Sequence, residues 1–138
     1  QKWLKRNPIK NYFPVPNEVF LLGLSPGELA VYSYLLFCED RSTYQCWPSF
    51  KTIGKGTGMS TNTVRKYVRM LEDRGLITTD PTSIITKDGQ KRNGNLLFTI
   101  RPIQEAVEQF YQQQLEKISL DVQREKVSGT KARQERSA

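Results

Sequence analysis

The stretch that decides the fold runs from Ser49 to Ile77 and has the sequence SFKTIGKGTGMSTNTVRKYVRMLEDRGLI. Ser60 is a favoured N-cap residue, and Gly75 can adopt the left-handed conformation that ends a helix, so we expect a helix over about 61–74. Ser49 is a second N-cap residue and predicts a shorter helix over about 49–55. A Gly-containing tight turn between them then joins two consecutive helices.

The longer of these two helices is predicted to be amphipathic. At about 100° per residue, its apolar and polar side chains fall on opposite sides. The apolar side consists of Val64, Tyr67, Val68 and Leu71. The polar side consists of Asn62, Lys66, Arg69 and Asp73, with Arg65 on its flank. On its own, this pattern is equally typical of a surface helix whose charged side is simply solvated.

The polar side has the chemistry that the major groove of DNA recognises. An Asn side chain can form two hydrogen bonds with adenine, and Arg and Lys can reach guanine or phosphate. We therefore assign base contacts to Asn62, Lys66 and Arg69. The remaining hydroxyl and cationic side chains of the two helices are assigned to the DNA backbone, namely Ser49, Lys51, Ser60, Thr61, Thr63 and Arg65.

A β-hairpin is predicted after the second helix. Apolar and β-branched runs at 76–79, 84–86 and 96–100 flank two strong reversal signals, Asp88-Gly89 and Asn93-Gly94. The tip carries three further cations, Lys87, Lys91 and Arg92, which we assign to the DNA backbone beside the second helix. The alternative is that these charges only protect an exposed sheet edge.

These elements, in this order, resemble the winged helix-turn-helix domains of bacterial plasmid replication initiators, primosome-loading proteins and small regulators. The likeness covers about 24–100. The matching positions are Pro48, Ser49, Ser60, Thr63, Val64, Leu71, Gly75, Leu76 and Ile77. The resemblance implies an α+β fold that is mostly α, with a three-helix core, a hairpin wing and a DNA-binding role. Gly54 and Gly56 depart from the pattern, so the helix that contains them is expected to be short or frayed.

The rest of the chain divides around this domain, which we place at residues 25–101. Residues 1–24 form a basic and aromatic arm, residues 102–126 a long helix, and residues 127–138 a polar tail expected to be disordered. Ser25-Pro26-Gly27-Glu28 is a capping box that starts a helix over about 25–39. The expected core consists of Leu29, Leu36, Ile53, Val64, Val68, Leu71 and Ile77. The arm's cations either enter a minor groove or are solvated, and its aromatic part packs on this domain or on a second copy.

The predicted C-terminal helix carries apolar residues at helical spacing. They are Ile103, Val107, Phe110, Tyr111, Leu115, Ile118 and Val122. We interpret this stripe as a dimerisation surface, because a two-fold protein suits a DNA site made of inverted repeats. Two alternatives remain: the helix folds back on its own chain, or it connects to a further C-terminal domain.

Composition favours an anionic partner and argues against catalysis. The net charge is +7, and residues 50–100 hold nine Lys or Arg against four acidic residues. The 138 residues include no His and two Cys, Cys38 and Cys46, which leaves no His-based triad and too few ligands for structural zinc. No catalytic residue, cofactor or metal is therefore expected. No apolar run is long enough to span a bilayer, so we expect a bacterial cytoplasmic protein.

The sequence thus predicts sequence-specific binding of double-stranded DNA. The protein would act either as a transcriptional regulator or as the replication initiator of a mobile element. The alternative is a winged-helix module of a replication or partition complex, which binds other proteins and has little direct affinity for DNA.

Overall fold

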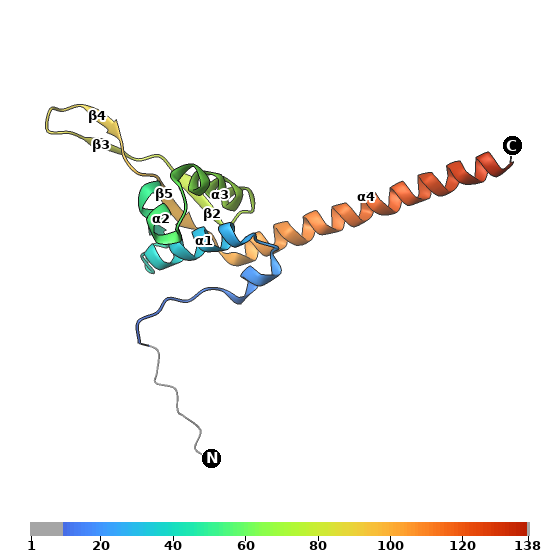
Figure 1. The fold of residues 1–138 in the computed structure, drawn as a ribbon, viewed down its shortest axis with the longest axis horizontal. Coiled ribbons are helices and arrows are strands. Elements are labelled where there is room, and N and C mark those ends of the chain that lie inside the picture. The colour runs from blue at the N-terminus through green and yellow to red at the C-terminus, as the bar shows by residue number, and fades with distance from the viewer. Residues whose placement is uncertain (1–9, 138) are drawn as a thin grey trace, which may run out of the picture.

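The computed structural model describes residues 10–137, and over 130–137 only the course of the backbone. Three helices, α1 (Pro26–Cys38), α2 (Phe50–Thr57) and α3 (Thr61–Asp73), pack together against a small antiparallel sheet. A slender hairpin leaves this body on one side, and the long helix α4 (Ile103–Ser137) leaves it on the other (Figure 1). The predicted fold class, α+β and mostly α, is confirmed.

Each core helix begins at a serine that the sequence predicts as its N-cap. The backbone N–H groups of Glu28, Thr52 and Thr63 donate to the hydroxyl oxygens of Ser25, Ser49 and Ser60 at 3.3, 3.0 and 3.2 Å. The Glu28 carboxylate accepts in return from the Ser25 backbone N–H at 3.2 Å, which completes the capping box. The helix starts are therefore determined locally, by the residues that satisfy the first free N–H groups.

Glycine at position 54 allows the turn between α2 and α3 to close tightly. A Cβ atom there would lie 2.5 Å from the backbone oxygen of Met59, whose N–H donates to the Gly54 carbonyl at 2.9 Å. Gly58 then takes the left-handed conformation, with φ of 75°. The helix was expected to be short or frayed: with eight residues α2 is short, but it continues to Thr57, two residues beyond its predicted end. Close packing offsets the helix-propensity cost of about 1 kcal/mol for each glycine.

The core lies between the three helices and the sheet. Six of the seven predicted core residues are buried, and Leu29 is half-buried at the edge of the core. Other large, fully buried side chains include those of Tyr32, Leu35, Leu76 and Phe98. Phe98 is at the centre of the sheet, so the hairpin is anchored to the same core as the helices.

The three-stranded sheet has the order β1 (Gln45–Cys46), β5 (Leu97–Ile100), β2 (Ile77–Asp80), with both pairings antiparallel. Phe98 lies opposite Cys46 on one side and Thr79 on the other. β1 was not predicted, because two residues carry no alternating pattern. The Cys46 side chain is buried in the core, as expected for a cysteine that behaves as a small hydrophobic residue.

Beyond β2 and β5 the hairpin continues as β3 (Ser83–Ile85) paired with β4 (Lys91–Asn93); we call residues 81–96 the wing. The chain reverses at Gly89, whose φ is 79° and whose N–H donates to the Thr86 carbonyl at 2.9 Å. The prediction of a second reversal at Asn93-Gly94 is wrong. Asn93 pairs with Ser83, and the Gly94 N–H donates to the Thr82 carbonyl at 2.8 Å, so the two arms of the hairpin stay paired here and the chain does not reverse.

Helix α4 has a packed beginning and a long exposed remainder. Ile103, Ala106, Val107 and Phe110 contact the core, whereas the side chains from Tyr111 to Gly129 are exposed. The expected disordered tail is wrong over 127–137, because α4 runs to Ser137; a single Gly and Ser among good helix formers does not stop a helix that is already nucleated. None of the helices described combines the length and apolar character needed to cross a bilayer.

The N-terminal segment lies beside α1 and the start of α4. A 3₁₀ helix, η1 (Asn17–Leu21), buries Val19 and is followed by Gly23 with φ of 69°. Its N-cap residue is Pro16. Of the predicted basic arm, Lys10 is exposed, and Lys2, Lys5 and Arg6 lie outside the described residues.

Candidate nucleic-acid interface

Helix α3 presents one face to the core and the opposite face to solvent. Val64, Val68 and Leu71 are buried, which fixes the rotation of the helix about its axis. The three residues predicted to contact bases, Asn62, Lys66 and Arg69, are exposed together on the other face. Asp73 is exposed at the end of the same face. The structure therefore brings an amide and two cations onto one accessible ridge, with a negative charge at one end.

Two of the cations on α3 lie over aromatic rings. The Arg65 guanidinium lies 5.5 Å from the centre of the Phe50 ring on α2, and the Lys66 ammonium lies 5.3 Å from the centre of the Tyr67 ring. Cation–π contacts at exposed positions contribute about 0.5–1 kcal/mol and leave the charge accessible. Phe50 thus holds Arg65 where α2 and α3 meet, a contact that the sequence did not predict.

The hydroxyl groups predicted to meet the DNA backbone are mostly used within the protein. Ser49 and Ser60 cap their helices, and their hydroxyls also bond those of Thr52 and Thr63 at 2.8 and 2.9 Å. Thr61 and Lys51 are exposed. The assigned hydroxyls of Ser49, Ser60 and Thr63 thus help to form the two helix starts, whereas Thr61 and Lys51 remain accessible to a partner.

The wing carries its three cations in different settings. Lys87 lies in the exposed loop at the tip, whereas Lys91 and Arg92 belong to strand β4. Arg92 lies opposite Ile84 and Lys91 opposite Ile85, so consecutive cations point to opposite faces of the two-stranded ribbon. Lys91 and Arg92 were assigned to the hairpin tip, and this assignment is corrected to strand β4. Because they point to opposite faces, only one of them can contact a partner that lies on one side of the wing.

Arg74, at the end of α3, is turned inward although sequence reasoning assigned it no role. Its guanidinium forms an ion pair with Glu28 and donates to the carbonyls of Leu22 and Gly23 at 2.8 and 3.3 Å. Burial raises the pKa of Glu28, but hydrogen bonds from Arg74 and Ser25 outweigh it, so the pKa lies below its ordinary value. This pair fixes the end of α3 against the start of α1, and its partners are too far apart in sequence for a local pattern to reveal it.

The described side chains outside this face offer no metal site. Within residues 10–129, His, Cys, Asp and Glu side chains form no group of three or more that could hold a metal ion. Cys38 and Cys46 are free thiols, and burial raises the pKa of Cys46 to about 12.

Comparison with known proteins identifies the helix-turn-helix segment. The sequence model of a family described as "Helix-turn-helix domain" matches residues 22–77. A search of curated proteins gave no match. Among solved structures, the chain is similar to a "possible transcriptional regulator" from Methanosarcina mazei Go1, with 16% identity, a TM-score of 0.50, and coverage of 75% of this chain and 80% of that one. It also matches a "probable transcriptional regulator" from Pseudomonas aeruginosa, with 27% identity, a TM-score of 0.38, and coverage of 80% and 78%.

The family match begins at residue 22, directly after η1, and ends at the first residue of β2. The first structural match supports the fold of the larger part of the chain. The hairpin that follows α3 adds the wing to this domain. Residues 22–77 are thus similar to the helix-turn-helix domain family, and the chain has the winged helix-turn-helix fold.

Proposed function

We propose that this protein binds double-stranded DNA in a sequence-specific manner, with α3 in the major groove and the wing beside it. In this arrangement Asn62, Lys66 and Arg69 contact base edges. Lys51, Thr61 and Arg65 hold the phosphates around α3. The helix starts that contain Ser49, Ser60 and Thr63 face the DNA backbone. Lys87 and one of the two cations on β4 hold the flanking backbone.

The face of α3 carries this proposal. A buried side made of Val64, Val68 and Leu71 leaves the helix no freedom to turn, so its amide and cationic side chains are held outward. An α-helix fits the major groove of B-form DNA, where Asn, Lys and Arg are the side chains that distinguish base pairs. The net charge of +7 adds sequence-independent attraction to phosphate.

Selection of bound sequences from a random duplex pool, followed by fluorescence anisotropy on the selected site, tests the proposal. Arg69→Ala should weaken binding to the selected site by about 1–3 kcal/mol and relax the preference at one base pair. Arg124→Ala, which removes the same charge from the exposed part of α4, is the matched control and should leave the preference unchanged. No enriched sequence, or equal losses for the two variants, would contradict sequence-specific binding through α3.

Two biological roles are compatible with such binding, a transcriptional regulator and a replication initiator of a mobile element. Either would act in the cytoplasm of a bacterium, where the DNA lies. The arrangement of selected half-sites distinguishes them: a palindrome in the protein's own promoter supports regulation, and a series of direct repeats at an origin supports initiation.

We also propose that the protein is a homodimer formed through the exposed part of α4. Tyr111, Leu115, Ile118 and Val122 are between 44% and 60% exposed, and at about 100° per residue they lie within about 60° of one another around the helix. Ile103, Val107 and Phe110, which were assigned to the same surface, contact the core of their own chain. The dimer surface is accordingly restricted to the part of α4 beyond Phe110.

A protein-interaction module is the second candidate function, because apolar side chains are also exposed outside α4. Phe20 and Leu21 of η1 are exposed, as is Phe37 at the end of α1. Under this alternative the protein has little affinity for any duplex at low salt, whereas a basic DNA-binding domain binds even random DNA at micromolar concentrations or better.

A further inference from the structure

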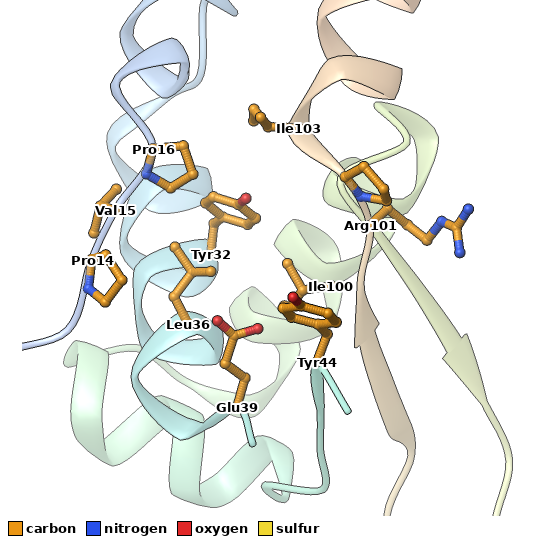
Figure 2. Close-up of a pocket in the computed structure, with 11 residues that line it drawn as sticks. Pro14, Val15, Pro16, Tyr32, Leu36, Glu39, Tyr44, Ile100, Arg101 and Ile103 are labelled. Atoms are coloured by element: carbon orange, nitrogen blue, oxygen red, sulfur yellow. The ribbon is translucent and has the colours of Figure 1, made fainter. Parts of the chain in front are cut away.

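A cavity of about 450 Å³ lies on the side of α1 that faces the N-terminal segment and the junction between β5 and α4. One wall is formed by Pro14–Pro16 with Tyr32 and Leu36, and the other by Tyr44 with the stretch Ile100–Ile103 (Figure 2). Cavities of this size are typical of sites for small organic molecules. None of these residues is among those assigned to DNA, so the inference does not depend on the proposed function.

The walls of the cavity are largely apolar. Val15, Leu36, Ile100 and Ile103 supply aliphatic surface, and the rings of Tyr32 and Tyr44 supply aromatic surface on either side. A molecule that enters this space gains free energy mainly by removing apolar surface from water. Its body is therefore expected to be aromatic or branched aliphatic.

One carboxylate enters this apolar space. Figure 2 shows the Glu39 carboxylate between Leu36 and Tyr44, at one end of the cavity. Its Oε2 atom is buried, and no group within residues 10–129 donates a hydrogen bond to it. A buried acceptor without a donor is costly, and a charged one more so, so a donor of opposite charge is the chemical complement of this atom.

The nearby cations do not neutralise Glu39. The Arg101 guanidinium is held by Glu105, at 3.1 and 2.8 Å, and points away from the cavity (Figure 2). Burial raises the pKa of Glu39, and the charge of Arg41 opposes this effect without cancelling it. Neither Arg41 nor Arg101 forms an ion pair with the Glu39 carboxylate, so an occupant could supply that partner.

We propose that this cavity binds a small organic cation, with an aromatic or branched aliphatic body and a protonated amino group that donates to the Glu39 carboxylate. The apolar walls hold the body, and the amino group forms the ion pair that Glu39 lacks. Such an occupant touches α1, which packs on α3, and the residues from which α4 departs. It would therefore link the helix-turn-helix to the base of the long helix.

Titration of the full chain with phenethylamine, followed by methyl NMR, tests the proposal. The expected result is saturable binding that shifts the methyl signals of Leu36, Ile100 and Ile103. The methyl signals of Ile53, a buried residue of α2, should not shift. Phenethyl alcohol has the same body without the charge, and hydrocinnamate carries the opposite charge. Both should bind at least about tenfold more weakly, because a hydrogen bond to a charged partner is lost or replaced by repulsion.

Glu39→Gln should weaken phenethylamine binding about tenfold or more, whereas Glu108→Gln, which removes the same charge from an exposed position on α4, should not change it. If Glu39→Gln does not fold, the three probes on the natural chain still decide the matter. Equal affinity for phenethylamine and phenethyl alcohol, shifts confined to residues outside the cavity, or no saturation at millimolar concentrations would overturn the proposal.

Discussion

Glu28, in the first turn of α1, and Arg74, at the end of α3, form a two-pronged ion pair although the Glu28 side chain is only 1% exposed. The same guanidinium also donates to the carbonyls of Leu22 and Gly23, which precede α1. The pair therefore connects the start of α1 to the end of α3. In this way it helps to fix the position of α3, whose exposed face carries Asn62, Lys66 and Arg69.

Replacing Arg74 by Met should destabilise the fold by about 3 kcal/mol, because the buried Glu28 carboxylate would lose its charged partner. We choose the lower end of the range for broken buried pairs, since the Arg74 side chain is 29% exposed. Urea unfolding measures the change. The control is Arg101→Met, which breaks the exposed Arg101–Glu105 pair and should have little effect on stability. Equal changes for the two variants would contradict a structural role for the buried pair.

The contribution of this pair should also depend on pH. Burial raises the pKa of Glu28, but hydrogen bonds from Arg74 and Ser25 and the charge of Arg74 bring it below 4.5. A carboxyl group whose pKa is lower in the folded state stabilises the fold above its unfolded pKa, and this stabilisation is lost as the pH falls through the folded pKa. The stability difference between the natural chain and Arg74→Met should therefore be full at about pH 7 and shrink below about pH 4.5. A constant difference across both pH values would exclude this linkage.

Most of the fold that the sequence predicts is specified over short distances. The three serine caps, the apolar side of α3 and the reversal at Gly89 each depend on residues within one or two helical turns or one hairpin loop. Pairings between distant segments were missed. β1 is recognisable only by its pairing with β5, and the Glu28–Arg74 pair joins residues 46 positions apart.

The candidate DNA-binding face follows the same division. The rotation of α3 was predictable because its buried side chains repeat at helical spacing, so the exposure of Asn62, Lys66 and Arg69 follows. The opposite orientations of Lys91 and Arg92 were not predictable, because they depend on the strand register of the wing. The sequence also did not show that the apolar stripe on α4 contacts the core up to Phe110 and is exposed beyond it. Helical spacing does not reveal where the core ends.

Gly54→Ala should destabilise the protein even though Ala is the better helix former. The new Cβ atom would lie 2.5 Å from the Met59 oxygen, and this atom belongs to the backbone of the turn and cannot move aside alone. We expect a net loss of about 1–3 kcal/mol in thermal or urea unfolding. Gly129→Ala is the control, because its Cβ would meet open space on α4; it should raise helicity without lowering stability. If Gly54→Ala stabilised the protein, close packing would not be the reason that position 54 requires glycine.

Alanine substitutions at the two cations of β4 should have unequal effects on DNA binding. Lys91 and Arg92 point to opposite faces of the wing, so only one of them can contact the DNA that α3 occupies. The effective substitution should weaken all duplexes alike and lower the slope of log affinity against log salt by about one, while the other leaves the slope unchanged. Anisotropy titrations at several salt concentrations measure both. If both variants lost the same amount of DNA affinity, the wing would attract DNA through its total charge and not through one defined face.

Ile118→Lys should convert the proposed dimer to a monomer. Ile118 lies at the centre of the exposed stripe formed by Tyr111, Leu115, Ile118 and Val122, and a lysine there would place a charge inside the contact between two helices. Leu120→Lys is the matched control, because Leu120 is also exposed but lies about 180° away around the helix.

Sedimentation equilibrium should show a monomer for the first variant and a dimer for the second. The core is not involved, so the thermal unfolding of the helix-turn-helix domain should be unchanged at dilute concentrations. If the natural chain is monomeric at micromolar concentrations, the exposed stripe does not pair with its own copy, and a two-fold DNA site would no longer be expected.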